Sequence, residues 1–371
     1  MTDLSKLFKK AALAGVVISF SGMAGATILT SIKPLGFIAS SIADGVTDTQ
    51  VLVPAGASPH DYSLKPSDIQ KVKSADLILW IGEDVDAFLE KNISQDVDSA
   101  KVLTIAKFSD VTEDMLLKGE HHHHHHGDHD HDHDHDHDHD HDHDHDHDHD
   151  HDHDHDHDHD HDHDHDHDHD HDHDHDHGHA GKHAHNHEHE SHDHHDAHGA
   201  LETNWHVWYS PKISQIAAHH LADKLTQLYP NKKDVIAKNL AEFNRTLAEQ
   251  NEKINQQLAP VRDKGFYVFH DGYTYFNSAY KLNQKGAFTI NPLVAPGVKT
   301  LTKIKQEIDE HQVQCLFAEP QFTPKVVERL SKGTGVKVGM LDPMGGPVDL
   351  GKNSYAKFLQ FTADSYYNCL K

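Results

Sequence analysis

Residues 232–258 read KKDVIAKNLAEFNRTLAEQNEKINQQL. The apolar residues of this stretch recur at spacings of 3, 4 and 7, which is the period of one face of an α-helix; they are Ile236, Leu240, Phe243, Leu247, Ile254 and Leu258. The pattern predicts a single long helix that ends near Pro260. Such a helix would extend about 40 Å, which is enough to reach across two domains.

Apolar strands alternate with helices on both sides of this stretch. Before it we expect strands at 27–32, 50–53, 76–81 and 102–106, and helices at 34–43, 66–72, 85–89 and from Ser210-Pro211 onward. After it we expect strands at 265–269, 287–290, 313–318 and 336–341, and helices at 273–280, 301–311, 324–331 and 354–370. Continuous apolar strands are typical of parallel sheets that helices cover on both faces. The predicted fold is α/β, with two parallel-sheet lobes joined by one long rigid helix.

The segment from His121 to His198 contains 40 of the 46 histidines, including 25 consecutive Asp-His dipeptides from Asp128 to His177. Its formal charge equals the net charge of the whole chain, −28, so the remainder is neutral. Because it has almost no apolar side chains, we expect a disordered insert in the absence of metal. Imidazole and carboxylate both bind metals, and so many interchangeable ligands predict numerous overlapping weak sites.

The first 26 residues resemble a secretory signal peptide. Three lysines precede an apolar stretch at 11–20, and Ala24-Gly25-Ala26 is a small-residue cleavage site. The apolar stretch is too short to span a bilayer comfortably. We therefore expect a mature chain that begins at Thr27 and is exported to the periplasm.

These features divide the chain into five segments. The predicted segments are a signal peptide (1–26), an N-terminal α/β lobe (27–120 and 199–231), the His/Asp-rich insert (121–198), a linking helix (232–259) and a C-terminal α/β lobe (260–371). In an exported chain the two cysteines, Cys315 and Cys369, favour one disulfide; two buried thiols are the alternative.

Three of the six histidines outside the insert lie where open α/β sheets bind ligands, at the carboxyl ends of strands or just before a helix. His60 follows the expected strand at 50–53, His270 ends the strand at 265–269, and His206 precedes the helix that begins at Ser210-Pro211. Asp342 ends the strand at 336–341. Singly, each would more often be structural, but their joint position, together with a metal-collecting insert in the same chain, favours a metal-binding role. The remaining three, His219, His220 and His311, lie within helices, and we interpret them as surface residues.

Several motifs carry a family resemblance. They are LVPAGASPHDYSLKPSD at 52–68, HVWYSP at 206–211, FHDGY at 269–273, FAEPQF at 317–322 and LDP at 341–343. In this order they resemble the cluster A-I (ZnuA-like) family, the periplasmic zinc-binding proteins of ABC importers. The resemblance covers essentially the whole mature chain. It implies that His60, His206 and His270 ligate Zn²⁺ in the cleft between the lobes and that the zinc passes to a membrane permease driven by a cytoplasmic ATPase.

One residue departs from the family pattern. Zinc-type relatives often have Glu directly before the first His, whereas this chain has Pro59. The fourth zinc position is then open to water or to Asp342, which could instead make hydrogen bonds at the lobe interface. Manganese-type relatives usually have Glu at the third position, and His270 therefore favours zinc, as does the softness of three imidazoles. We interpret Glu319 as part of a structural salt bridge.

These features favour a zinc-binding transport protein rather than an enzyme. Two alternatives remain: a zinc storage protein whose functional part is the insert, and a zinc hydrolase, since three His plus water is also the composition of a catalytic site. Against the hydrolase, the chain has no His-Glu-x-x-His pair. We further expect a monomer that binds no nucleic acid and does not insert into membranes.

Overall fold

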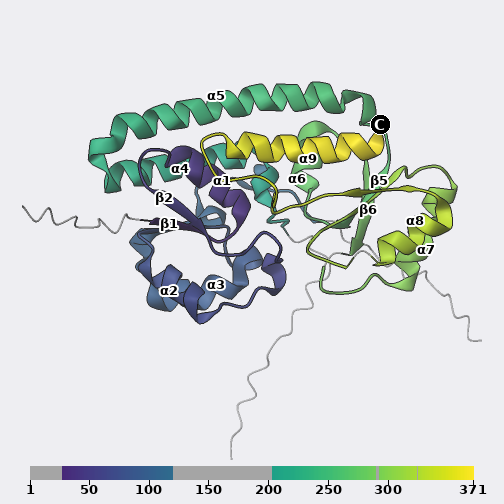
Figure 1. The fold of residues 1–371 in the computed structure, drawn as a ribbon, viewed down its shortest axis with the longest axis horizontal. Coiled ribbons are helices and arrows are strands. Elements are labelled where there is room, and N and C mark those ends of the chain that lie inside the picture. The colour runs from purple at the N-terminus through teal and green to yellow at the C-terminus, as the bar shows by residue number, and fades with distance from the viewer. Residues whose placement is uncertain (1–26, 120–202, 290–291, 324) are drawn as a thin grey trace, which may run out of the picture. The chain divides into compact units, whose positions relative to one another are not determined.

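The structure is a computed structural model that describes residues 27–119, 203–289, 292–323 and 325–371 (Figure 1). The expected signal peptide at 1–26 and the expected His/Asp-rich insert at 121–198 lie outside these residues. No helix in the described ranges is both long enough and apolar enough to cross a membrane.

The first sheet has four parallel strands in the order β2-β1-β3-β4. The strands are β1 (Thr27–Thr30), β2 (Asp48–Val51), β3 (Leu77–Trp80) and β4 (Val102–Thr104). Its helices are α1 (Lys33–Ile42), α2 (Pro66–Ser74), α3 (Glu83–Asp96) and α4 (Pro211–Leu228). All four residues of β3 are buried, as expected for a central strand that is covered on both faces.

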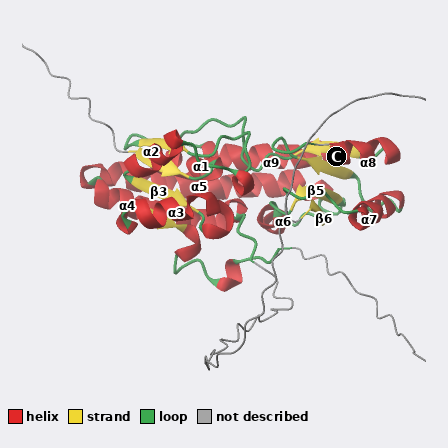
Figure 2. Ribbon diagram, turned by 90° about the horizontal axis from the view of Figure 1, so that it is seen from below, coloured by secondary structure: helices red, strands yellow, loops and turns green. Residues whose placement is uncertain are grey.

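The second sheet repeats this topology, with four parallel strands in the order β6-β5-β7-β8. The strands are β5 (Phe266–His270), β6 (Gln284–Thr289), β7 (Cys315–Ala318) and β8 (Lys337–Met340), and the helices are α6 (Thr274–Tyr280), α7 (Val298–Asp309), α8 (Lys325–Thr334) and α9 (Ser354–Leu370). Figure 2 shows helices lying against the strands of each sheet. In each sheet the second strand in sequence lies on one side of the first strand, and the third lies on its other side. Ligands of open α/β sheets bind at the carboxyl ends of the strands at such a switch point.

The predicted long helix is α5 (Lys233–Leu258), which follows α4 and leads into the second sheet. Figure 1 shows it running alongside α4 and α9, and it packs against both. Five of its six predicted apolar positions are buried, and Leu240 is partly buried. The buried positions belong to one core that also contains Ile28 of β1 and Phe266 of β5. The predicted α/β class, with two parallel sheets and one long helix between them, is confirmed.

Some element boundaries differ from the prediction. Strand β2 begins and ends two residues earlier than expected. The backbone N–H groups of Leu52 and Val53 still donate hydrogen bonds to the carbonyls of Thr30, at the end of β1, and of the next residue, Ser31. The helix predicted at 85–89 is the longer α3, which is kinked at Asp86 (φ −103°, ψ 37°). Asp86 is buried and its Oδ2 accepts hydrogen bonds from Ser31 and from the backbone of Ile81. The helix was predicted from the spacing of apolar residues, and a buried aspartate within it interrupts that spacing.

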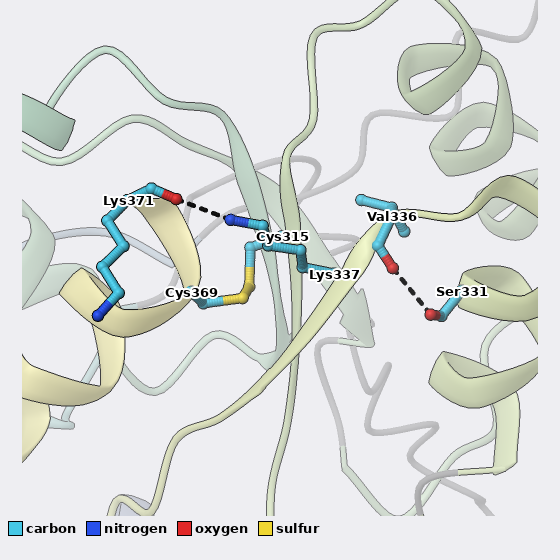
Figure 3. The surroundings of a disulfide bond; sticks show 6 residues. All are labelled: Cys315, Ser331, Val336, Lys337, Cys369 and Lys371. Atoms are coloured by element: carbon cyan, nitrogen blue, oxygen red, sulfur yellow. Dashed lines mark hydrogen bonds between the residues drawn. A yellow bond between two sulfur atoms is a disulfide. The ribbon is translucent and has the colours of Figure 1, made fainter.

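The predicted disulfide is present between Cys315 of β7 and Cys369 of α9 (Figure 3). Both cysteines are buried. Close by, Nζ of Lys337 in β8 donates a 2.7 Å hydrogen bond to the backbone carbonyl of Lys371, just after α9. The C-terminal helix is therefore attached to two neighbouring strands of the second sheet.

Candidate metal centre

His60 lies in a short 3-10 turn, Pro59–Asp61, that follows the loop after β2. Ser58 precedes the turn, and its hydroxyl accepts a hydrogen bond from the backbone N–H of His60 (3.2 Å). A proline at the first position suits such a turn, because its fixed φ and missing N–H cost nothing there. The first lobe thus presents the His60 imidazole from a locally capped turn.

His206 lies just before a second 3-10 turn, Val207–Tyr209, which leads into α4. Asn204 Oδ1 accepts from both the backbone N–H and ring Nδ1 of His206, at 3.0 and 2.8 Å. The amide of Asn204 in turn donates to the backbone carbonyl of Asp271 (2.7 Å). This arrangement puts the proton of His206 on Nδ1 and leaves the lone pair of Nε2 free for a metal.

His270 is the last residue of β5, and Glu319 follows directly after β7, the strand next to it. The Nδ1 atom of His270 lies 2.7 Å from Oε1 of Glu319. Both residues are buried, with 3% and 1% exposure. The carboxylate therefore orients the His270 ring as Asn204 orients His206, again leaving Nε2 free.

The three Nε2 atoms converge. Those of His60 and His206 are 3.2 Å apart, and those of His206 and His270 are 3.3 Å apart. Among the described residues, these three histidines form a group whose ligand atoms all lie within 4.8 Å of one another. Two nitrogens bound to a tetrahedral ion at the usual zinc–nitrogen distance would be about 3.3 Å apart. The spacing of the two close pairs therefore fits a shared tetrahedral ion.

The protonation of these imidazoles follows from burial and from their neighbours. Burial disfavours the charged ring and lowers the pKa of His60 to about 4, with the nearby His270 acting in the same direction. The pKa of His206 is lowered well below its ordinary value for the same reasons. Burial also opposes the charged form of His270, but the adjacent Glu319 carboxylate outweighs it and raises the pKa of His270. Two of the three rings are thus neutral, the state in which imidazole binds metal.

The walls of this pocket are largely apolar. Trp208, Phe322, Pro343 and Met344 line it together with the three histidines. Beside the His270 ring, position 272 has space only for glycine, because a Cβ there would lie 2.7 Å from Nε2 of His270. Water is thus excluded from most of the rings' surface, which strengthens electrostatic interactions inside the pocket.

In the part of the chain that the structure describes, Asp342 and Glu319 lie outside the group of three histidines. Asp342 is buried, but its carboxylate accepts from Gln321 Nε2 (2.8 Å) and from the backbone N–H groups of Met344 (3.0 Å) and Gly346 (2.7 Å). Its contacts therefore match the second role considered for it, that of a hydrogen-bonding residue. Glu319, interpreted as part of a structural salt bridge, pairs with His270. His121 to His198 lie outside the described residues.

Three residues near the site were not singled out from the sequence. They are Asn204, Gly272 and Gln321. Gly272 and Gln321 lie within the motifs FHDGY and FAEPQF, which pointed to the family but not to a role for either residue. For Asn204, the Asn-x-His spacing of residues 204–206 is compatible with a local side-chain turn. The other two act through contacts that exist only in the folded chain.

Comparison with known proteins agrees with this geometry. A family model described as "Zinc-uptake complex component A periplasmic" (ZnuA) matches residues 28–369. Among curated proteins, the high-affinity zinc uptake system protein ZnuA of Haemophilus influenzae is 65% identical over 99% of both chains. The protein of the same name from Yersinia pestis is 37% identical over the full length of both.

Solved structures show the same fold. A crystal structure of ZnuA superimposes with a TM-score of 0.64 at 19% identity, covering 94% of this chain and all of the other. The periplasmic zinc-binding protein TroA of Treponema pallidum gives 0.65 at 15% identity, covering 93% and 99% of the two chains. At these identities the likeness concerns the fold alone. From the family model and the full-length relatives, however, the chain belongs to the ZnuA family, the periplasmic component A of zinc-uptake complexes.

Proposed function

We propose that this protein captures Zn²⁺ in the periplasm through the Nε2 atoms of His60, His206 and His270. It then delivers the ion to the membrane permease of a zinc ABC importer, which a cytoplasmic ATPase drives. The observation that carries the proposal is the convergence of the three Nε2 atoms, with separations of 3.2 and 3.3 Å for two of the pairs. Asn204 and Glu319 support it, because each holds the second nitrogen of one ring.

Water completes the coordination in this proposal. Pro59, the residue before the first histidine, has no ligating atom in its side chain. Both oxygens of Asp342 already accept hydrogen bonds from Gln321 and from backbone N–H groups. Three protein ligands and one water are an established coordination set for zinc. Three imidazoles also favour zinc over manganese, which prefers carboxylate and water oxygens.

The origin of the ligands explains how a tightly held ion can be released. His60 comes from the loop after β2 in the first sheet, whereas His270 ends β5 in the second. A movement that separates these two loops removes at least one ligand from the ion. Docking on the permease would release zinc by favouring this separation, since a partner shifts a conformational equilibrium only by binding one state more tightly.

Residues outside the described ranges have separate roles in the proposal. The segment from His121 to His198 collects zinc at many weak sites and supplies the cleft. The protein reaches the periplasm after cleavage of residues 1–26 and acts as a monomer. The carrier role is thus assigned to the folded lobes and the auxiliary role to the insert.

Zinc titration of a variant that lacks residues 121–198 tests this division. We expect one tightly bound zinc per chain, with affinity reduced roughly a hundredfold or more by His60→Ala. His219→Ala is the matched control, because His219 is exposed and lies outside the histidine group. Absence of any tight site after the deletion would instead favour storage by the insert. Turnover of simple esters or peptides that His60→Ala abolishes would favour the hydrolase.

A further inference from the structure

Gln321 joins the two lobes beside the histidine pocket. It follows β7 by three residues, and its Nε2 donates to the backbone carbonyl of Ala55 and to Oδ1 of Asp342, both at 2.8 Å. Ala55 lies in the first lobe, in the loop that leads from β2 to His60. Because both neighbours of Nε2 are acceptors, the orientation of the amide is determined. A single side chain therefore connects the His60 loop to the second sheet.

The other end of this amide is unpaired. Gln321 lines the same pocket as the three histidines. Its Oε1 is buried and has no hydrogen-bond partner among the described residues, and the same holds for Oε2 of Glu319, which also lines the pocket. A buried acceptor without a donor is unfavourable. Two such acceptors at one pocket indicate that a donor belongs there when the site is filled.

We propose that Gln321 is a positioning residue that couples zinc occupancy to lobe closure. This rests on the proposed function, in which water is the fourth zinc ligand. A zinc-bound water is a strengthened donor, because the metal polarises it. It donates to Oε1 of Gln321, and the amide is thereby held with its NH₂ group between Ala55 and Asp342. Zinc then stabilises the closed arrangement of the lobes through its differential affinity for that arrangement.

The contacts of Asp342 extend this coupling. Its carboxylate accepts from the N–H groups of Met344 and Gly346 and thus shapes the loop whose Met344 lines the pocket. The carbonyl of Gly346 accepts a 2.7 Å hydrogen bond from Nζ of Lys33 at the start of α1. Gln321 is consequently connected through Asp342 to a second contact between the lobes.

The test uses the full-length protein with one equivalent of Zn²⁺, so that the tightest site fills first. Amide hydrogen exchange at residues 54–60, the rise in melting temperature on adding zinc, and chelator competition are measured in parallel. For Gln321→Met we expect zinc affinity to fall roughly tenfold. We also expect the zinc-dependent protection of residues 54–60 to disappear. Gln306→Met is the matched control. Gln306 is exposed, and its side-chain amide donates a hydrogen bond to Glu310, the residue after α7.

A second variant separates the two ends of the amide. Gln321→Glu keeps an acceptor for the water but cannot donate to Ala55 or Asp342. It should therefore lose the zinc-dependent protection while losing less affinity than Gln321→Met. If both variants kept wild-type protection at 54–60, the coupling would be refuted. The proposal would also be overturned if the Gln321 variants lost the same amount of melting temperature with and without zinc and kept the zinc affinity of the wild type. Gln321 would then have only a structural role. Tight zinc binding by His60→Ala would instead refute the proposed function itself.

Discussion

Nδ1 of His270 lies 2.7 Å from Oε1 of Glu319, at the edge where strands β5 and β7 end side by side. The pair connects the His270 ring to a buried carboxylate that is 49 residues away along the chain. A carboxylate at this position orients the imidazole and increases its basicity toward a metal. Glu319 is therefore part of the zinc-binding apparatus in our proposal, although it does not face the ion directly.

Replacing Glu319 by Gln should weaken zinc binding roughly tenfold to a hundredfold. The amide still accepts a hydrogen bond from Nδ1, but the charge that increases the basicity of His270 is lost. Chelator competition on protein without residues 121–198 measures the effect. Glu328→Gln is the control, since Glu328 is exposed on α8. Unchanged affinity in the Glu319 variant would mean that the carboxylate serves only the fold.

Gly272→Ala should displace the His270 ring. The added Cβ would lie 2.7 Å from Nε2 and 2.9 Å from Cε1 of His270, which is closer than real contacts allow. We expect zinc affinity to fall by roughly tenfold or more, while the protein stays folded by circular dichroism. Gly56→Ala is a nearby control, because a Cβ there meets nothing within 4 Å. Equal zinc affinities of the two variants would contradict this account of the site.

Removal of the Cys315–Cys369 disulfide should affect stability and leave the zinc ligands intact. The two cysteines are 54 residues apart in sequence, and the chain-entropy model assigns such a loop about 4 kcal/mol. The Cys315→Ala, Cys369→Ala double variant should thus melt at lower temperature but still bind one zinc in the cleft. Cobalt-substituted wild-type protein should show no sulfur-to-cobalt charge-transfer band. A strong band of this kind would show that a thiolate ligates the metal.

The stability of the zinc-free protein should depend on pH through His60. Its pKa is lowered in the folded state to about 4, whereas the unfolded chain takes up this proton near pH 6.5. Stability from the neutral ring is therefore present above about pH 6.5 and is lost as the pH falls toward 4. The difference in unfolding free energy between wild type and His60→Ala should decrease over this window. Parallel pH profiles of the two proteins would contradict the shift.

Zinc occupancy of the insert and of the cleft should respond differently to acid. Histidines in a solvated segment protonate near pH 6.5, and protonated imidazole cannot ligate zinc. The cleft should retain zinc to lower pH, because metal competes better with protons where its affinity is higher. Burial, which lowers the pKa of His60 and of His206, acts in the same direction, whereas Glu319, which raises the pKa of His270, opposes it. Occupancy of the intact protein and of the variant without residues 121–198 is compared at pH 7.5 and 5.5. If both classes of site shared one pH midpoint, the insert could not act as a proton-sensitive reservoir.

Local patterns were sufficient to predict most of the fold. The stripe from Ile236 to Leu258 predicted α5 because helical spacing of apolar side chains is independent of distant contacts. His60, His206 and His270 could be grouped because each lies after a strand, at the end of a strand or just before a helix, where open α/β sheets bind ligands. The prediction was weakest where a buried polar group interrupts a pattern, as Asp86 does in α3.

The detailed arrangement of the site could not be predicted in the same way. Asp342 remained ambiguous between ligand and hydrogen-bond acceptor, because a strand-end carboxylate suits either role until its partners are known. Its partners include Gln321, which also reaches Ala55, a residue 266 positions away in the chain. Such contacts depend on how two sheets pack, which no local spacing encodes.

The sequence by itself determined the class of the protein: two α/β lobes, a long helix between them, a His/Asp-rich insert and three histidines at strand ends or before a helix. These properties follow from periodicity and residue chemistry, which act over a few residues at a time. Only the tertiary structure decided which nitrogen of His206 and of His270 is available, through Asn204 and Glu319, and which groups donate hydrogen bonds to Asp342. The physical reason is that a hydrogen bond requires alignment within a few tenths of an ångström, and packing of the whole chain produces that alignment.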